Sequence, residues 1–163
     1  MAAKSRKNKA KEVRSVVSNK KAYRNFELLE RFEAGLQLLG SEVKSLRAGT
    51  ADLDGSYARI EDEQCWLVGA NIAPYQKAGP GGHEPARRRK LLLHKAEIRK
   101  VSGKLEQRGF TFVPLRIFFN DRGLAKIELA LARGKRKYDK RRKIDERIQK
   151  RDVDRDMKKY RKG

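Results

Sequence analysis

The basic residues of this chain gather at its two ends, and the segment between them is nearly neutral. Residues 1–24 hold nine Lys and Arg against one acid, and residues 133–163 hold sixteen against six. Segment 25–132 holds seventeen bases and fourteen acids, a net charge of only +3. Since strong self-repulsion opposes compaction, only this middle part can build a core. The pattern predicts one folded domain over 19–132, with basic arms at 1–18 and 133–163 that stay disordered until a polyanion neutralises them.

The total charge indicates the kind of partner. Lys and Arg number 42 against 21 acids, a formal net charge of +21, and such an excess in a small protein is typical of binding to RNA or DNA. The sequence has no run of 18 apolar residues, so we expect no membrane partner. The single cysteine, Cys65, allows neither an internal disulfide nor a cysteine-based zinc site. This cysteine usage fits the reducing cytoplasm.

The middle segment favours short antiparallel strands. From Phe26 to Leu38 apolar residues fall mainly on even positions and polar residues on odd ones, and this alternation favours a strand. A helix stays open there because the composition is rich in Glu and Leu. Gly40 breaks the run, and Ser41 is placed to cap a short helix over 42–48.

Turn residues separate two further pairs of apolar runs. They predict two hairpins, 57–60 with 64–72 and 110–119 with 124–132. A Gly- and Pro-rich loop is expected over 73–85, and apolar spacing predicts a helix over 91–107. Together these elements predict a mainly β fold: a small closed or nearly closed antiparallel barrel with two or three added α-helices.

Residues that could carry out catalysis or hold a metal are few. His83 lies in the Gly- and Pro-rich loop and His94 follows an apolar run, and neither has an acidic or cysteine partner at metal-ligand spacing. Cys65 is expected to be a small core residue, and the acids at 61–63 a solvated turn. The glycines at 79–82 lack the Lys-Ser/Thr of a phosphate-binding loop. We therefore expect no enzyme activity, no cofactor and no metal.

The C-terminal arm alternates positive and negative charges, which supports a helix through ion pairs one turn apart. At helical spacing its apolar residues take two opposite sides, with Ile144 and Ile148 on one and Val153, Met157 and Tyr160 on the other. Such a helix has no single face to bury against its own domain. We expect it to form only inside a surrounding partner; a solvated charged tail is the alternative.

Composition and pattern alone stop at a basic nucleic-acid-binding module, and charge does not exclude DNA. Four tyrosines are available to stack on unpaired bases, although each could equally be a residue of the barrel surface: Tyr23, Tyr57, Tyr75 and Tyr138.

Several short segments carry a resemblance to a known family. The most distinctive are Glu-Val-Lys-Ser-Leu-Arg at 42–47 and Arg-Lys-Leu-Leu-Leu at 89–93. Others are Asn-Lys-Lys-Ala at 19–22, Phe-Glu-Ala-Gly-Leu at 32–36, Gly-Ala-Asn-Ile at 69–72 and Gly-Lys-Arg-Lys-Tyr-Asp-Lys-Arg at 134–141. In this order and spacing they closely resemble the SmpB family, the tmRNA-binding (SsrA-binding) proteins of bacterial trans-translation. The resemblance covers residues 17–143; beyond Ile144 the tail matches only in character.

The resemblance implies an antiparallel OB-like β-barrel with added helices and a role in rescuing ribosomes. Such proteins bind the tRNA-like end of tmRNA, support its alanylation, and accompany it with elongation factor Tu into the vacant A site of a stalled ribosome. There the protein stands in for the missing anticodon arm, and its tail folds as a helix in the empty mRNA channel. The implied partners are tmRNA and the ribosome, with its small-subunit rRNA, and, through tmRNA, elongation factor Tu and alanyl-tRNA synthetase.

Carried over residue by residue, the resemblance implies this tmRNA-facing set: Asn19, Lys20, Glu33, Lys44, Arg47, Leu92 and Lys126. The Asn19 amide can both donate and accept, so it could read a base edge or a ribose hydroxyl. Glu33 could accept from base amino or imino groups, and its alternative is a salt bridge to Lys44 or Arg47. Leu92 could instead pack the predicted helix against the barrel.

The resemblance also implies a set of ribosome-contacting residues in the tail: Lys135, Arg136, Tyr138, Asp139, Lys140, Arg141, Ile144 and Met157. Tyr138 can stack on a ribosomal base, and the bases would contact phosphates. Arg136 replaces a Lys of the family pattern and keeps its charge. A structural rRNA-binding protein of the ribosome, or of its assembly, is the other class that such basic arms would suit.

Overall fold

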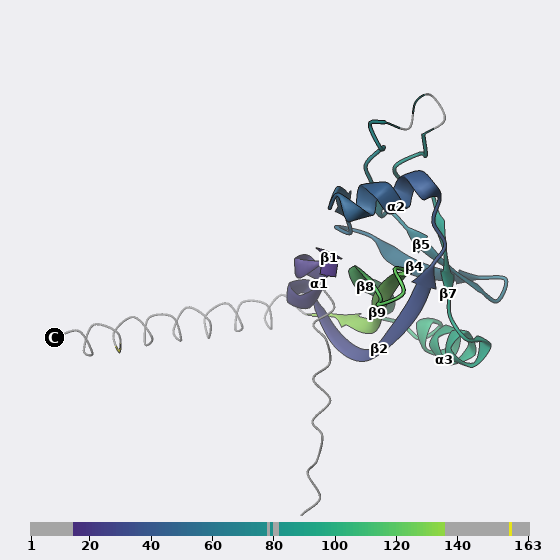
Figure 1. Cartoon of the computed structure of the whole chain (residues 1–163). Helices are drawn as coiled ribbons and strands as arrows, with labels where there is room; N and C mark the ends of the chain where they lie inside the picture. Colours follow the sequence, from purple (N-terminus) through teal and green to yellow (C-terminus); the bar gives the residue numbers. More distant parts are fainter. Residues whose placement is uncertain (1–14, 78, 80–81, 136–156, 158–163) are drawn as a thin grey trace, which may run out of the picture.

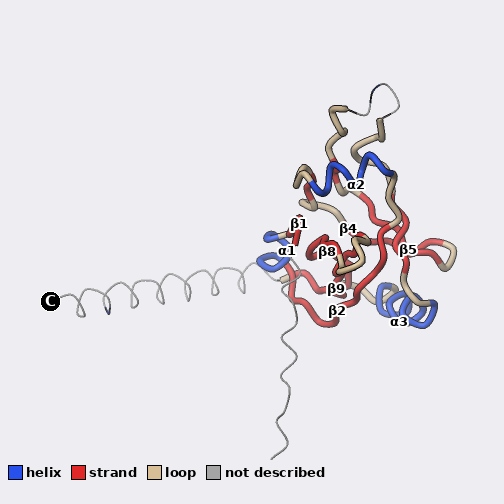
Figure 2. The backbone as a smooth tube through the Cα atoms, viewed as in Figure 1, coloured by secondary structure: helices blue, strands red, loops and turns tan. Residues whose placement is uncertain are grey.

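The computed structural model describes residues 15–77, 79, 82–135 and 157. They form a mainly β structure with three helices (Figure 1; Figure 2). The helices are α1 (Lys20–Asn25), α2 (Gly40–Arg47) and α3 (Lys95–Leu105). The strands are β1 (Ser15–Ser18), β2 (Phe26–Leu36), β3 (Ala51–Asp52), β4 (Tyr57–Glu61), β5 (Gln64–Val68), β6 (Asn71–Ile72), β7 (Arg89–Leu92), β8 (Phe110–Phe119) and β9 (Ala125–Gly134).

The larger sheet closes on itself. Its strand order is β1-β8-β4-β5-β7-β2-β9, and β9 also pairs with β8, so the strands from β8 round to β9 form a ring. β1 adds to the other edge of β8, where Val17 lies opposite Ile117. The predicted closed antiparallel barrel is confirmed, as is the β8–β9 hairpin. The β4–β5 hairpin is also present, but its second strand ends at Val68 rather than at residue 72, because Asn71–Ile72 form β6 and pair with β3. Closure pairs strand edges that would otherwise be exposed.

Strand β2 serves two hydrophobic clusters because of one bulge. Leu28, ahead of the bulge, lies opposite Ala132 in a small outer cluster beneath α1, whereas Glu30, just beyond it, lies opposite Leu131 of the barrel core. The extra residue at the bulge reverses the face that later side chains take. Glu33 consequently points outward, and the even positions that follow the bulge point into the barrel: Phe32, Ala34 and Leu36.

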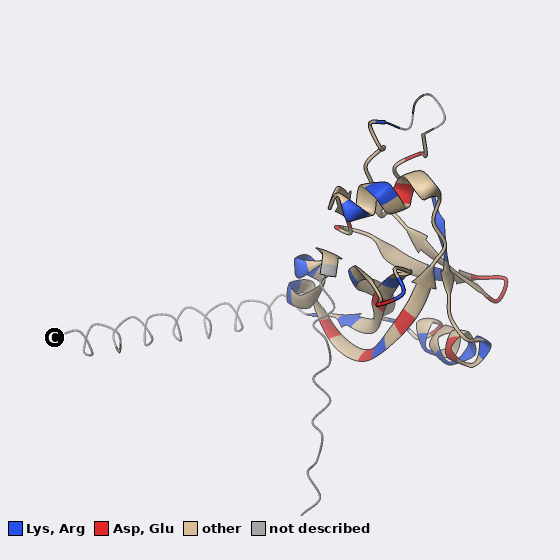
Figure 3. Cartoon of the chain, in the orientation of Figure 1, with Lys and Arg blue, Asp and Glu red and all other residues tan. Residues whose placement is uncertain are grey.

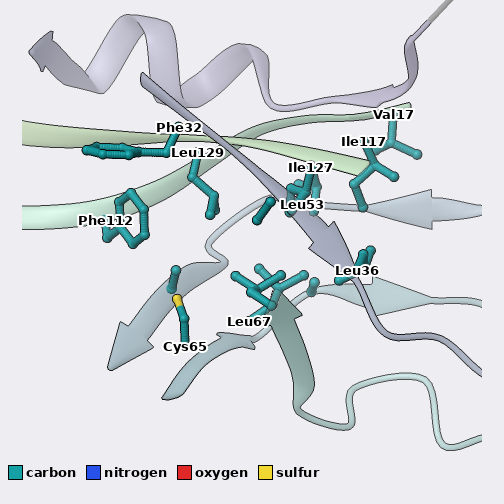
Figure 4. Close-up of a cluster of buried hydrophobic side chains, with 14 of the residues drawn as sticks. Val17, Phe32, Leu36, Leu53, Cys65, Leu67, Phe112, Ile117, Ile127 and Leu129 are labelled. Atoms are coloured by element: carbon teal, nitrogen blue, oxygen red, sulfur yellow. The ribbon is translucent and has the colours of Figure 1, made fainter. Parts of the chain in front are cut away.

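Side chains of the barrel strands gather in one core (Figure 4), to which α2 and α3 also contribute. The rings of Phe32 and Phe112 meet edge to face with their centroids 5.7 Å apart. Leu46 of α2 and Val101 of α3 are fully buried in this core. Cys65 is buried there as predicted, and its burial raises the pKa of the thiol to about 12. A thiol held neutral in this way is unreactive.

The predicted cap of α2 is wrong. The helix begins at Gly40, and the backbone N–H of Leu39 donates to Oε2 of Glu42 at 2.7 Å, which closes its first turn. The Ser41 hydroxyl lies instead 2.9 Å from Nδ1 of His83. A carboxylate three residues into the helix can take the role that the sequence pattern assigned to a preceding serine.

The predicted helix over 91–107 began too early. Residues 89–92 form strand β7, and α3 begins only at Lys95. A short apolar run fits a strand or a helix equally well by periodicity. Residues 89–92 form a strand because neighbouring strands pair with them on both sides: Leu91 lies opposite Cys65 of β5 and Leu36 of β2.

The folded domain is longer than the predicted 19–132 at both ends. Ser15–Ser18 pair with β8, and Val17 is buried, so these residues are not part of a disordered arm. At the other end β9 runs on to Gly134, which lies opposite Phe26. At the N-terminal end the apolar valines of β1 extend the fold, and at the C-terminal end the continued pairing of β9 with β2 does so. Both extensions lie in segments that were predicted to be arms because of their overall charge.

Candidate nucleic-acid interface

Three residues form a row across the outer face of the barrel near the end of β2. Gly35 lies opposite Leu92 of β7 on one side and opposite Lys126 of β9 on the other. Directly opposed residues of antiparallel strands point to the same face. Gly35 has no side chain, and a Cβ there would lie 3.2 Å from the Cβ of Leu92. The glycine therefore makes room for Leu92 to lie over it.

This row presents an apolar side chain beside a cation. Leu92 is 56% exposed, and it belongs to β7 rather than to a helix, so the alternative that it packs a helix against the barrel is wrong. Lys126 is partly exposed at the start of β9. A rigid apolar contact next to a positive charge suits a nucleotide, whose base or ribose can pack and whose phosphate is charged.

Glu33 is an acidic member of this surface. It points outward two residues before Gly35, and its Oε1 lies 3.4 Å from Nζ of Lys126. Glu33 therefore does form a salt bridge, but its partner is Lys126 and not Lys44 or Arg47, which the sequence alternative named. The Glu33 side chain is 59% exposed, and an ion pair so exposed contributes little to stability. Its carboxylate is available to a donor on a ligand.

Two arginines extend the same face and were missed from the sequence. Glu128, opposite Glu33 in the next strand, accepts from Arg31 at 3.1 Å and from Arg116 at 2.5 Å. Both guanidiniums remain well exposed. The outward odd positions of β2 were the available signal for Arg31, but nothing in the sequence places Arg116 of β8 beside them.

Helix α2 adds two exposed cations, Arg47 at the β8–β9 turn and Lys44 beside Tyr75. The Arg47 guanidinium lies 5.3 Å from the ring centre of Phe119, and a Cβ on Gly123 would be 3.6 Å from its Nη2. Nζ of Lys44 lies 5.2 Å from the ring centre of Tyr75. The aromatic contacts hold both side chains at the surface. Lys126 follows the same turn, so α2 and the row on β7, β2 and β9 are neighbours.

Asn19 serves the fold rather than the surface. The residue is buried, its Nδ2 donates to the carbonyls of Leu53 and Pro114 at 3.1 and 3.2 Å, and its Oδ1 accepts from the N–H of Ala22 at 3.0 Å. The bond with Ala22 caps α1. The bond to Pro114 ties the start of α1 to β8, at a point between the residues of β8 that pair with β4 and those that pair with β1. Because both amide hydrogens are used internally, we revise the interpretation that Asn19 reads RNA directly. Lys20, beside it, is exposed.

A buried ionic cluster beneath α2 was also missed. The carboxylate of Glu42 accepts from Arg89 at 2.9 Å and from Arg87 at 2.5 and 2.7 Å, and both Glu42 and Arg89 are fully buried. Burial alone would raise the pKa of Glu42, but the bonds from Arg87 and Leu39 and the arginine charges outweigh it and lower that pKa. The Leu39–Glu42 spacing could have indicated the cap; no sequence signal indicates Arg89.

His83 is held internally by separate contacts, with the Ser41 hydroxyl of α2 2.9 Å from its Nδ1. Its Nε2 lies 3.0 Å from the carbonyl of Ile72, and the residue is buried. The prediction of a loop position is confirmed, but a side chain held in this way has no free edge for RNA.

The tail residues can be placed only in part. Lys135 closes the end of α1, where its N–H donates to the Asn25 carbonyl at 3.0 Å and its Nζ to the Tyr23 carbonyl at 2.9 Å. Met157 is helical and 66% exposed. The other predicted contacts lie outside the described residues: Arg136, Tyr138, Asp139, Lys140, Arg141 and Ile144. So do residues 1–14, and with them the prediction that both arms are disordered.

Within the described part of the chain, no group of three or more His, Cys, Asp and Glu side chains could hold a metal ion. The same residues include no helix long and apolar enough to cross a membrane.

Fold and surface together define a small closed β-barrel with exposed cations on one face and on the attached helices, a class of protein suited to nucleic acids. The model of the SmpB protein family matches residues 16–159. The chain therefore belongs to the SmpB family.

Individual relatives are similar along most of their length. The SsrA-binding protein of Sulfurihydrogenibium sp. (strain YO3AOP1) is 50% identical over 143 residues, which are 88% of this chain and 93% of that protein. The SsrA-binding protein of Thermus thermophilus is 54% identical over 127 residues, 78% of this chain and 88% of that one. A solved structure described as "tmRNA-SmpB: a journey to the center of the bacterial ribosome" matches with a TM-score of 0.64 and 53% identity over 74% of this chain and 84% of that chain.

Proposed function

We propose that this chain binds the tRNA-like domain of tmRNA through the outer surface of β7, β2, β9 and α2. The observation that carries the proposal is the row of Leu92, Gly35 and Lys126, an exposed apolar contact fixed beside a cation on a rigid sheet. The name shared by its relatives, SsrA-binding protein, supports the same partner.

Each residue of this surface has a distinct part in the proposal. Leu92 packs against a ribose or base, and Lys126, Lys44 and Arg47 neutralise phosphates. Glu33 leaves its exposed pair with Lys126 and accepts from base amino or imino groups, since an ionised carboxylate offers acceptors alone.

The residues of α1 act together. Asn19 fixes the start of this helix by its three internal hydrogen bonds, and so holds Lys20 where it can contact a phosphate. Asn19 is thus a positioning residue, and Lys20 is the contact.

We further propose that the protein acts in the cytoplasm and brings tmRNA to the A site of a stalled ribosome. Elongation factor Tu and alanyl-tRNA synthetase take part through tmRNA. The basic tail occupies the empty mRNA channel, with its cations on rRNA phosphates, Tyr138 on a base, and Ile144 and Met157 on opposite walls. The sequence supports this by its alternating charges and two apolar sides.

The experiment separates the barrel from the tail. Truncation after Lys135 keeps every described strand, so affinity for tmRNA should stay nearly unchanged while peptide tagging on stalled ribosomes is lost. Leu92→Ala should weaken tmRNA binding itself, whereas Leu29→Ala, at an equally exposed leucine of the β2 bulge, should not. A truncated, folded protein that no longer binds tmRNA would contradict the division.

A further inference from the structure

Two hollows flank helix α1 on the outside of the barrel. One, of about 420 Å³, is lined by residues of β1, α1 and β3. The other, of about 350 Å³, is lined by residues of α1, β4 and β8, and we name it the α1 pocket. Its size is that of sites for small ligands. The ion pair of Lys21 with Asp54 stands between the hollows, and both residues line each of them.

An aromatic wall and an apolar floor form much of the α1 pocket. Ala58 of β4 lies opposite Phe112 of β8, and both point into the barrel core. Their neighbours Tyr57 and Val113 must therefore point outward, because side chains alternate along a strand. Val113 is buried in the outer cluster with Phe26 packed against it, whereas Tyr57 is 41% exposed. The tyrosine ring thus stands free at the side of the pocket.

Two polar side chains in the pocket are not used by the fold. Within the described part of the chain, neither the Asn25 amide nor the Thr111 hydroxyl has a hydrogen-bond partner. Ser56, which also lines the pocket, differs because its hydroxyl donates to the Leu53 carbonyl at 2.6 Å. An amide offers both donors and an acceptor, and a hydroxyl offers one of each kind. These are the groups that hydrogen-bond the edge of a base.

The surroundings of the pocket are basic. Helix α1 has the sequence Lys-Lys-Ala-Tyr-Arg-Asn, without an acid, and Lys135 lies against its C-terminal end. Asp54 is the one acid among the lining residues, and Lys21 pairs with it. Figure 3 shows these charges on α1 at the side of the barrel away from α3. A flexible phosphate chain would be attracted to this rim.

We propose that the α1 pocket receives an unpaired base of RNA. The base stacks on Tyr57, Asn25 and Thr111 hydrogen-bond its edge, and the lysines and arginine of α1 neutralise the flanking phosphates. The contact goes beyond the proposed function, since it uses none of the residues on the β7–β2–β9 surface. It rests on that function in having RNA as its partner, and it shares with it Lys20 of α1. The unpaired nucleotide belongs either to tmRNA or to rRNA of the small ribosomal subunit.

The test compares three variants of the full-length protein: Tyr57→Leu, Tyr57→Phe and Asn25→Ala. Affinities are measured separately for tmRNA and for small ribosomal subunits. Loss of one stacked base weakens binding by about 5- to 140-fold, so Tyr57→Leu should lower one of the two affinities by a factor in this range. Tyr57→Phe keeps the ring and should bind as the unchanged protein does, and Asn25→Ala should weaken the same RNA more mildly.

Direct occupancy is followed by NMR of the unchanged protein with short single-stranded oligoadenylate and oligouridylate. The ring signals of Tyr57 and the side-chain amide of Asn25 should shift, whereas those of Trp66 on β5 should not. The affinities of the Tyr57→Leu variant identify the RNA. If only its affinity for tmRNA falls, the base belongs to tmRNA; if only its affinity for small subunits falls, the base belongs to rRNA.

Unchanged affinities for both RNAs in folded Tyr57→Leu and Asn25→Ala variants would overturn the proposal. If Tyr57→Leu fails to fold, Asn25→Ala decides alone, because the Asn25 side chain is exposed and has no hydrogen-bond partner among the described residues. Leu92→Ala reports independently on the β7–β2–β9 surface. If Leu92→Ala strongly weakens tmRNA binding while Tyr57→Leu leaves both RNA affinities unchanged, the α1 pocket is rejected and the proposed tmRNA contact still holds.

Discussion

Glu33 and Glu42 carry the same carboxylate on neighbouring elements, and the protein uses them in opposite ways. Glu42 is fully buried and accepts from Arg87, Arg89 and the Leu39 N–H. Glu33 is 59% exposed, and Nζ of Lys126 lies 3.4 Å from its Oε1. The first carboxylate is completely surrounded by donors, and the second is nearly as free as in water.

The difference separates two kinds of charge in a very basic protein. A buried ion needs every partner it has, because the desolvation of an unpaired charge costs several kcal/mol. An exposed ion pair can be exchanged for contacts with a ligand at little cost, since water already competes for it. The charges that hold this fold together are therefore not the charges that can meet RNA.

The largest expected effect is on the buried side of this comparison. Glu42→Ala leaves Arg89 fully buried without a carboxylate, and removal of one partner from such a pair destabilises by about 3–5 kcal/mol. Urea unfolding measures the change in the free energy of unfolding. Glu33→Ala is the matched control and should change it by less than about 1 kcal/mol. If both variants lower the free energy of unfolding equally, the distinction between a structural Glu42 and a surface Glu33 is wrong.

On the exposed side, the expected effect is on binding. Glu33→Ala should weaken tmRNA binding by about 1–3 kcal/mol, the scale of losing a charge-assisted contact and leaving its partner unpaired. Its thermal midpoint should barely move. Glu30 is the control, since it lies on the same strand but pairs with Lys100 and Lys104 of α3. If Glu30→Ala weakens binding as much as Glu33→Ala, the assignment of the surface is wrong.

A smaller effect should appear as pH dependence. The pKa of Glu42 is lowered in the folded protein from its ordinary value of 4.5, so its carboxylate stabilises the fold fully above that value. This contribution is lost as the pH falls from about 4.5 through the lowered pKa. Unfolding followed between neutral and acidic pH should show a shallower decline in Glu42→Gln than in the unchanged protein. Parallel curves would mean that Glu42 contributes no pH-dependent stability.

The smallest effect expected is a change in salt dependence. Lys44 of α2 is exposed beside Tyr75, and a lysine that neutralises one phosphate contributes about 1 to the slope of log affinity against log salt. Lys44→Gln should reduce the slope for tmRNA by about that amount. Lys100→Gln on α3 should leave the slope unchanged, and a reduction there would extend the RNA-binding surface to α3.

Alternating patterns allowed much of the barrel to be predicted. The alternation of β2 and the turn residues of the β8–β9 hairpin specify strands whose inner faces must be buried, and the structure confirms both. The run at Leu91 was different, because only its pairing with Cys65 and Leu36 makes it a strand. Pairing between segments far apart in the chain leaves no local pattern.

The candidate site was predictable mainly through resemblance. It supplied Leu92 and Lys126, but not the reason they meet, which is the shared partner Gly35. It also supplied Asn19 without its role, because the carbonyls of Leu53 and Pro114 come from distant segments. The buried Arg89 has a charge like any other in the sequence, and only tertiary burial distinguishes it.

The most direct test follows leucine methyl signals by NMR as the tRNA-like domain of tmRNA is added. Leu92, Leu29 and Leu39 are about equally exposed, at 56%, 51% and 50%, so exposure alone cannot distinguish them. The proposed surface predicts a large shift for the Leu92 methyls and none for those of Leu29 on the β2 bulge. A shift at Leu29 with Leu92 unmoved would place the RNA on another face of the barrel and contradict the account.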